Sequence, residues 1–412
     1  MDFCRLLRYS REMLFLHTSD WHLGKSLYET SLLEDQRFFL GQLTEHMQRQ
    51  EESGEPYSAL IVAGDIYDKA VPGPEAVSLL SSFLSEVKCT FPRLHVFLIP
   101  GNHDSAARLS FAADILASQN IHIAADARRC DIPVIVESNG ERAAVYQIPF
   151  LTPLCLSSSS GAMLRRQDEL AGEACERILA RHREQFGNLP CVAAAHLFTD
   201  GSGIELSGSE SGFAGNVEKV SVSHFRGFDY VALGHIHRKQ SCGSSSVWYS
   251  GSPLPYSFGE QNDKSVLRVS VSAGHAEVEP VGIRPLHPLV RLEGTFDSFL
   301  NAAVSDAVRN SYVEIVCTDG LEHEHPAELL RPRFANLLSF RMKRPEGEGL
   351  NRTIEERRKV VENLAADDYG VAFELFMKEL YGDSGELDSQ LYKDEKALFE
   401  QIAREAVLEE LK

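Results

Sequence analysis

The sequence predicts an α/β fold in which short buried strands end in polar loops that lead into helices. This pattern occurs three times early in the chain, with apolar runs at Met13–Thr18, Ala59–Ala63 and Leu94–Ile99. Runs this short and this rich in β-formers favour buried strands over helices. Farther along, two apolar or alternating runs flank Asn139-Gly140, a pair typical of a tight hairpin, so antiparallel strands are expected as well.

Apolar periodicity places the remaining elements of this first region. Helices are expected at about 32–50, 75–87, 106–118 and 162–185, and further strands at about 191–195, 228–233, 247–250, 265–272 and 276–281. The Gly/Ser-rich segment 199–215 predicts a long surface loop.

Four segments follow one another along the chain. Residues 1–12 are expected to be an N-terminal extension, and residues 13–283 a main domain. A change of composition at residue 284 marks a small α+β domain at 284–345. The last segment, 346–412, is helical in pattern but too small to bury its apolar face alone, which predicts a partner-binding segment.

Composition restricts the classes of partner. The 412 residues carry a formal net charge of -19, which argues against a broad basic surface that holds nucleic acid by counterion release alone. A polyanionic substrate would have to be met locally, by metal ions or by a partner protein. The eight cysteines have no metal-finger or disulfide-framework spacing, and no membrane span or signal core is apparent, so a cytoplasmic protein is expected.

The stretch Leu94 to Ser105 reads LHVFLIPGNHDS and delivers three polar residues at a strand end: Asn102, His103 and Asp104. An amide oxygen can bind a hard cation, whereas an imidazole can hold or give a proton near neutral pH. Taken alone, such a loop is more often a turn that caps the next helix.

Four other strand ends carry similar residues, and five such ends in one chain favour a functional site over five separate structural turns. The five ends present Asp20 and His22, Asp65, Asn102 and His103, His196, and His235 and His237. Singly, each acid could cap a helix and each histidine could be structural. Oxygen and imidazole ligands without thiolates suit manganese, iron or zinc, and seven of them suit two ions that share a carboxylate.

The motifs D-W-H, G-D-I-Y-D, G-N-H-D, A-H and G-H-I-H, in this order, resemble those of the calcineurin-like metallophosphoesterases. The runs HTSDWHLGK, FDYVALGHIH and YSGSPLPYSFGE make the resemblance closer to the SbcD family, the nuclease subunits of bacterial SbcC–SbcD complexes. The resemblance covers nearly the whole chain from Met13 onward, although the loop Ser207 to Gly215 departs from the charged pattern of that family.

This resemblance implies a metallophosphoesterase β-sandwich flanked by helices, a capping domain at 284–345 and a C-terminal segment that binds the SMC-like ATPase SbcC. It further implies a homodimer within a heterotetramer that acts in DNA repair, recombination and replication. The implied activity is that of a double-strand exonuclease and a single-strand and hairpin endonuclease.

The resemblance also assigns roles, with two metal ions, manganese above all. It implies one metal on Asp20, His22 and His237, a second on Asn102, His196 and His235, and Asp65 as the bridge. His103 is left to assist the leaving oxygen. Asp104 is a candidate to orient the His103 ring, with a helix cap as an equal alternative, and Asp68 either supports the site or ends its turn.

Two rival functions remain open. A generic phosphodiesterase or phosphatase would use the same ligands, but the capping domain and the tail argue against it. A scaffold with little activity of its own is disfavoured by the intact ligand set. Cleavage assays on duplex, hairpin and small esters would separate the three.

Overall fold

The computed structural model describes residues 12–158, 161–200, 218–260, 262–301, 303–319, 325–343, 373 and 396–399. The chain divides into two compact units, Met1–Cys317 with His323–Arg341, and Thr318–Glu322 with Met342–Lys412. Nearly all described residues belong to the first unit. The expected tail therefore lies outside the described residues, apart from Phe373 and 396–399, as do residues 1–11 and the loop Ser207 to Gly215.

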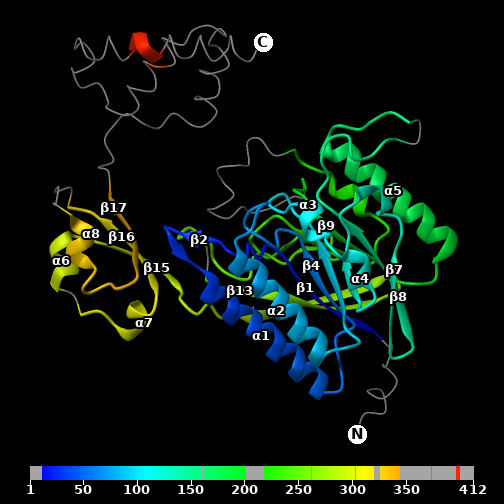
Figure 1. The fold of residues 1–412 in the computed structure, drawn as a ribbon, viewed down its shortest axis with the longest axis horizontal. Helices are drawn as coiled ribbons and strands as arrows, with labels where there is room; N and C mark the ends of the chain where they lie inside the picture. The colour runs from blue at the N-terminus through cyan, green and yellow to red at the C-terminus, as the bar shows by residue number, and fades with distance from the viewer. Residues whose placement is uncertain are drawn as a thin grey trace. The chain divides into compact units, whose positions relative to one another are not determined.

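Two six-stranded sheets form most of the first unit (Figure 1). The first has the order β14 (His275–Ile283), β13 (Lys264–Ser272), β1 (Met13–Thr18), β4 (Ala59–Ala63), β5 (His95–Ile99), β6 (Ile121–Ile123). The second has the order β11 (Gln240–Ser241), β12 (Val247–Tyr249), β10 (Tyr230–Gly234), β9 (Cys191–His196), β8 (Glu141–Ile148), β7 (Val134–Ser138). The α/β prediction is thus confirmed.

The alternation of side chains along the strands explains the layers. Phe15, Ile61 and Phe97 of the first sheet share an apolar cluster with Val192 and Ala232 of the second. Their sequence neighbours point the other way, so every central strand is buried on both faces.

Helices cover the two outer faces. The helices α1 (Leu33–Glu52) and α2 (Pro74–Thr90) lie side by side and pack on the first sheet, in a cluster that contains Leu16 and Leu60 (Figure 1). The helix α5 (Gln167–Gln185) packs on the second sheet through residues such as Ile178.

Strand direction decides where the loops meet. Pairing is parallel between β1 and β4 and between β4 and β5, and again between β8 and β9 and between β9 and β10. The carboxyl ends of β1, β4 and β5 therefore share one edge of their sheet, and those of β9 and β10 share one edge of theirs. In open α/β sheets this edge is where ligand sites form.

The predicted hairpin is present between β7 and β8, which pair antiparallel. Its two turn residues, Asn139 (φ 54°) and Gly140 (φ 83°), both adopt the left-handed conformation that a tight two-residue turn requires. A second, smaller hairpin joins β2 (Ser26–Leu27) to β3 (Thr30–Ser31).

The helix expected at 106–118 is wrong as one element. Two short helices occur instead, α3 (Ala106–Leu109) and α4 (Ala113–Ala117), because Ala112 between them is left-handed with φ 59°. The α5 helix also starts later than predicted, since the residues before it form a bridge between Ser157 and Met163.

A three-stranded sheet lies in the range 284–345, with the order β15 (Leu289–Gly294), β16 (Tyr312–Cys317), β17 (Leu337–Met342). Three short helices accompany it: α6 (Phe296–Asn301), α7 (Asp306–Arg309) and α8 (Pro326–Leu330). The buried carboxylate of Asp35 on α1 accepts hydrogen bonds from the backbone N–H of His287 and from the Tyr312 hydroxyl. These bonds attach the small sheet to the first helix of the sandwich.

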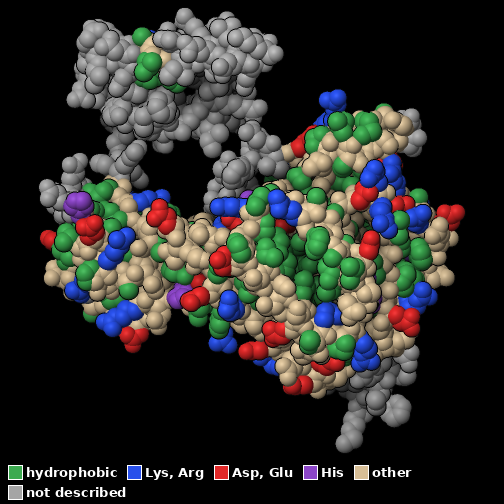
Figure 2. Space-filling view, viewed as in Figure 1, with side chains coloured by type: hydrophobic (Ala, Val, Ile, Leu, Met, Phe, Trp, Pro, Cys, Tyr) green, Lys and Arg blue, Asp and Glu red, His purple; other side chains and the backbone are tan. Residues whose placement is uncertain are grey.

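The described surface carries charges of both signs. On the face shown in Figure 2, the described Lys and Arg side chains are interspersed with Asp and Glu and form no continuous basic stripe. Among the described residues, no helix has both the length and the apolar character needed to cross a membrane.

Candidate metal centre

The predicted ligand residues converge where strands of both sheets end. Asp20 and His22 follow β1, Asp65 follows β4, Asn102 follows β5, His196 ends β9, and His235 and His237 follow β10. Groups of their side-chain oxygens and nitrogens lie within 4.8 Å of one another, for example those of Asp20, Asp65 and His196. The fold thus brings the predicted ligand residues together, and their role as ligands stays a prediction.

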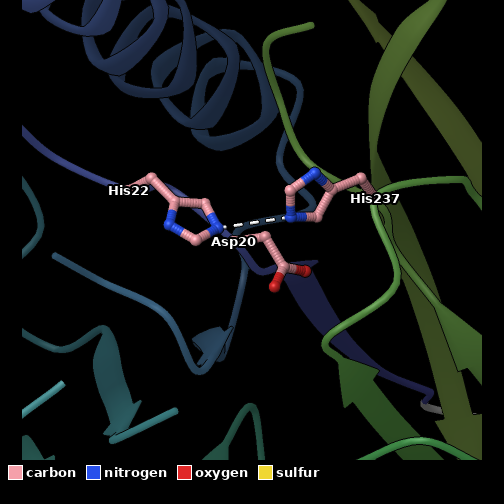
Figure 3. A group of neighbouring side chains, drawn as sticks. All are labelled: Asp20, His22 and His237. Atoms are coloured by element: carbon pink, nitrogen blue, oxygen red, sulfur yellow. Dashed lines mark hydrogen bonds between the residues drawn. The ribbon is translucent and has the colours of Figure 1, made fainter. Parts of the chain in front are cut away.

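One half of the centre contains Asp20, His22 and His237 (Figure 3). The rings of His22 and His237 face each other with their Nε2 atoms 3.2 Å apart, and the Asp20 carboxylate lies beside them. All three residues are buried, with exposed fractions of 0% for Asp20, 2% for His22 and 8% for His237.

The other half contains Asn102, His196 and His235. The Oδ1 atom of Asn102 lies 3.0 Å from His196 Nε2 and 3.0 Å from His235 Nδ1. Asn102 is exposed and His235 is partly exposed, whereas His196 is buried. This half consequently faces outward more than the first.

Asp65 lies between the two halves. Its Oδ2 atom is 3.4 Å from His196 Nε2 and 3.7 Å from His22 Nε2. Its Oδ1 atom accepts the backbone N–H of His103 at 2.9 Å, which fixes the carboxylate. The Asp65 side chain thus lies near a histidine ring of each half, while the Asp20 carboxylate accepts the backbone N–H of His235 at 3.1 Å.

A left-handed backbone conformation sets the direction of several of these side chains. Asp20, His22, Asp65 and His235 all have positive φ, between 44° and 103°. Asp20 and His22 lie beyond the end of β1 at Thr18 and are both left-handed, so they do not continue the extended strand. Their convergence comes from a tight turn.

Close approach between loops requires glycine at two positions. A Cβ atom on Gly101 would lie 2.2 Å from Asp65 Oδ1, and one on Gly64 would lie 2.2 Å from His196 Nδ1. The glycines of the motifs G-D and G-N-H thus leave the space that the neighbouring ligand side chains occupy.

Electrostatics couple Asp65 to His196. Burial alone would raise the pKa of Asp65, but the adjacent His196 imidazolium holds it well below the usual range of a carboxyl. Burial would lower the pKa of His196, but Asp65 raises it to about 9. Burial, followed by the charge of His196, lowers the pKa of His235 to about 4. A proton on His196 thus supplies positive charge beside the carboxylates of Asp65 and Asp20. A bound metal cation could supply the same charge.

The donor set fits divalent transition ions. Two carboxylates, one amide oxygen and four imidazoles, without a thiolate, are the mixture that manganese, iron and zinc accept. The Nε2 atoms of His22 and His237 also approach to 3.2 Å, so both rings turn these nitrogens towards one position. The residues present are therefore compatible with two ions that share Asp65.

Three supporting residues were missed by the sequence reasoning. Gln36 on α1 donates to the carbonyl of His22 at 2.7 Å, and the Tyr256 hydroxyl donates to the carbonyl of Trp21 at 2.5 Å. Glu260 lies 3.5 Å from His237 Nδ1. Tyr256 and Glu260 belong to the run YSGSPLPYSFGE, which the sequence marked only by resemblance, so that run was the available signal.

Asp68 supports the centre from behind rather than only ending its turn. Its Oδ1 atom lies 2.7 Å from Lys25 Nζ and 3.5 Å from His22 Nδ1. Burial tends to raise the pKa of Asp68, but the neighbouring His22 ring and Lys25, which donates a hydrogen bond to Asp68, lower it to about 2. A charged carboxylate thus stands behind the His22 ring.

His103 and Asp104 are separated in role. The His103 ring places Nδ1 2.9 Å from the carbonyl of Asp68 and Nε2 4.0 Å from Asp65 Oδ2, and its side chain is 43% exposed. The Asp104 carboxylate is directed away from this ring, since it accepts the backbone N–H groups of Gly101, Ile66 and Tyr67. Asp104 therefore connects the loop after β5 with the loop after β4. It is not the cap of the next helix, because Ser105 occupies that position before α3.

Comparison with known proteins agrees with this geometry. Residues 13–239 match the model of the calcineurin-like phosphoesterase family. The chain is also 29% identical over 332 residues to the SbcD component of the SbcCD nuclease of Staphylococcus epidermidis, across 80% of this chain and 85% of that relative. The family match includes every predicted ligand, while Glu260 lies beyond it.

Proposed function

Because the chain belongs to the calcineurin-like phosphoesterase family, we propose that it is a metal-dependent DNA nuclease. We propose exonuclease action on double-stranded ends and endonuclease action on single strands and hairpins. Family membership and the similarity to a nuclease component support the hydrolysis of phosphodiesters. The main structural support for this proposal is the convergence of carboxylate, amide and imidazole groups from five strand ends.

Two manganese ions are the proposed cofactors. Asp20, His22 and His237 would hold one, Asn102, His196 and His235 would hold the other, and Asp65 would bridge them. When bound, such ions attract a phosphodiester and lower the pKa of a coordinated water towards neutrality. The support is the position of Asp65 between the halves, within 4 Å of a histidine of each.

His103 is the proposed proton donor. Its Nδ1 atom faces a backbone carbonyl and so carries the N–H, which leaves Nε2 directed towards Asp65. The exposed ring can meet a substrate without leaving this hydrogen bond. In its imidazolium form, His103 would give the Nε2 proton to the leaving 3′ oxygen.

The proposed partner is an SMC-like ATPase, SbcC, in a complex that contains two copies of each chain and acts in DNA repair, recombination and replication. With a net charge of -19, this chain has little means to retain DNA against salt by itself. We place the ATPase contact in residues 346–412, of which Leu398 and Phe399 are exposed apolar residues.

Residues 284–345 are the proposed capping domain. The free thiols of Cys89, Cys130, Cys155, Cys175 and Cys191 support a cytoplasmic location.

One assay tests the proposal. The metal-free protein receives manganese and is offered labelled duplex, hairpin and single-stranded DNA, bis(p-nitrophenyl) phosphate and p-nitrophenyl phosphate, with and without SbcC and ATP. We expect cleavage of DNA and of the diester, and ATP-dependent cutting of duplex ends only with SbcC. Hydrolysis of the monoester without any cutting of DNA would point to a phosphatase instead, and no hydrolysis of any substrate would point to a scaffold.

A further inference from the structure

Two buried charged residues behind His237 have no part in the proposed reaction. Glu260 and Lys264 have side chains that are only 1% and 7% exposed, and Lys264 Nζ lies 2.6 Å from Glu260 Oε2. Burying a pair of charges costs desolvation free energy and gives little net stability, so such a pair needs another explanation.

The position of Glu260 relative to the His237 ring gives that explanation. Glu260 Oε1 lies 3.5 Å from His237 Nδ1, while His237 Nε2 faces the centre, 3.2 Å from His22 Nε2. A neutral imidazole carries its N–H on one nitrogen and a lone pair on the other. A carboxylate at Nδ1 favours the N–H there, which leaves the Nε2 lone pair directed at the centre.

Lys264 fixes this arrangement from two sides. Its ammonium group has three donors, and three acceptors surround it: Glu260 Oε2 at 2.6 Å, Ser252 Oγ at 2.9 Å and the backbone carbonyl of His237 at 3.2 Å. The same ammonium therefore holds both the carboxylate behind the ring and the backbone that carries the ring.

A second pair repeats the design. Lys25 holds Asp68 at 2.7 Å, and Asp68 lies 3.5 Å from His22 Nδ1. His196, in the other half of the centre, instead has its Nδ1 at 2.8 Å from the neutral carbonyl of Ala63. Both histidines of the buried half, and not His196, are thus backed by a lysine-bound carboxylate.

We propose that Glu260 and Lys264 are positioning residues that hold His237 in the tautomer and orientation needed to bind a divalent transition metal in the Asp20 half of the centre. This inference rests on the proposed function, since it presumes that the centre binds metal.

The test measures metal binding rather than hydrolysis. Metal-free wild-type protein and the variants Glu260→Gln and Glu260→Gln/Lys264→Met are titrated with manganese, by calorimetry and by the electron paramagnetic resonance of the free ion. Supporting groups of this kind typically contribute about 10- to 100-fold to metal affinity. We expect a loss of that size at one of two sites and an unchanged second site.

Controls separate this effect from misfolding. The double variant removes the lone buried ammonium that Glu260→Gln would leave, so it should recover the melting temperature of the metal-free protein but not the lost affinity. Glu279→Gln is the matched control, since that glutamate is exposed and pairs with Arg268 at 3.0 Å on the β14 strand.

The outcomes are distinct. Wild-type affinity at both sites in Glu260→Gln overturns the inference and leaves the proposed function intact, and so does an equal loss at both sites, which would indicate general collapse. Failure of the wild-type protein to bind manganese overturns the proposed function itself, and the inference with it.

Discussion

Asp20, His22 and His237 are all buried, and a lysine-bound carboxylate stands behind each of the two histidines. In the other half of the centre, Asn102 is exposed, His235 is partly exposed, and His196 is backed by a backbone carbonyl. Under the proposed function, the buried half would keep its ion in a fixed place. The half with the exposed Asn102 would meet a substrate, and the exposed His103 ring lies beside His22, with ring centroids 4.8 Å apart. The two proposed ions would therefore not be equivalent, and substitutions can separate their contributions.

The largest effect is expected where the halves join. Asp65→Ala removes the carboxylate within 4 Å of a histidine in each half, so both metals and all hydrolysis should be lost. Inductively coupled plasma mass spectrometry measures metal content, and bis(p-nitrophenyl) phosphate measures hydrolysis. A chelator applied to the wild-type protein should reproduce the loss of activity. The exposed Asp114 on α4 provides a matched control through Asp114→Ala. Two retained ions in Asp65→Ala would exclude Asp65 as the bridge.

The next effect concerns the exposed His103 ring, which lies beside His22. His103→Ala removes a proton donor and no proposed ligand, so metal content and DNA binding should persist while the cleavage rate falls about 10²- to 10⁴-fold. Single-turnover cleavage and metal analysis on the same sample measure both quantities. His275→Ala, at an exposed histidine of β14, is the control. If His103→Ala loses metal as Asp65→Ala does, His103 is a ligand and the division of roles is wrong.

A smaller effect is expected behind His22. Asp68→Asn keeps the size of the side chain but removes the charge that faces His22 Nδ1 at 3.5 Å. Manganese affinity should fall about 10- to 100-fold at one site, as in Glu260→Gln. If Asp68→Asn/Glu260→Gln is no weaker at that site than either single variant, the two carboxylates do not act on separate histidines.

The smallest effect concerns the choice of metal. Manganese should support faster cleavage than magnesium at equal concentration, because four of the seven proposed ligands are imidazoles, which magnesium binds poorly. Initial rates with metal-free protein and purified salts measure the difference. Equal turnover in magnesium, without trace transition metal, would contradict the proposed ligand set.

Strand ends were the part of the site that the sequence could predict. Apolar runs such as Ala59–Ala63 coincide with strands, and the polar residues at the ends of β1, β4, β5, β9 and β10 adjoin the centre. Strands that alternate with helices along the chain predict parallel pairing, which brings these loops to one edge of the sheet. Each strand and helix can be recognised from its own stretch of sequence.

Long-range supports could not be predicted in the same way. Glu260 lies 23 positions after His237, and Gln36 lies 14 positions after His22, so neither shares a local pattern with the ligand it supports. The orienting role expected of Asp104 rested on its neighbour in sequence, whereas its carboxylate reaches the backbone of Ile66 and Tyr67 instead. The left-handed turn at Asp20 also gave no signal, because neither it nor His22 is a glycine.

The positive φ angles of Asp20, His22, Asp65 and His235 have a thermodynamic consequence. Such conformations store about 1–3 kcal/mol of strain each in residues other than glycine, against a total stability of about 5–15 kcal/mol for a typical domain. The surrounding sandwich must supply that free energy when the centre is empty of metal. An ion that binds only the folded centre then stabilises it by mass action, so the melting temperature should rise with manganese concentration. The residues proposed to bind metal would therefore also lower the stability of the metal-free chain.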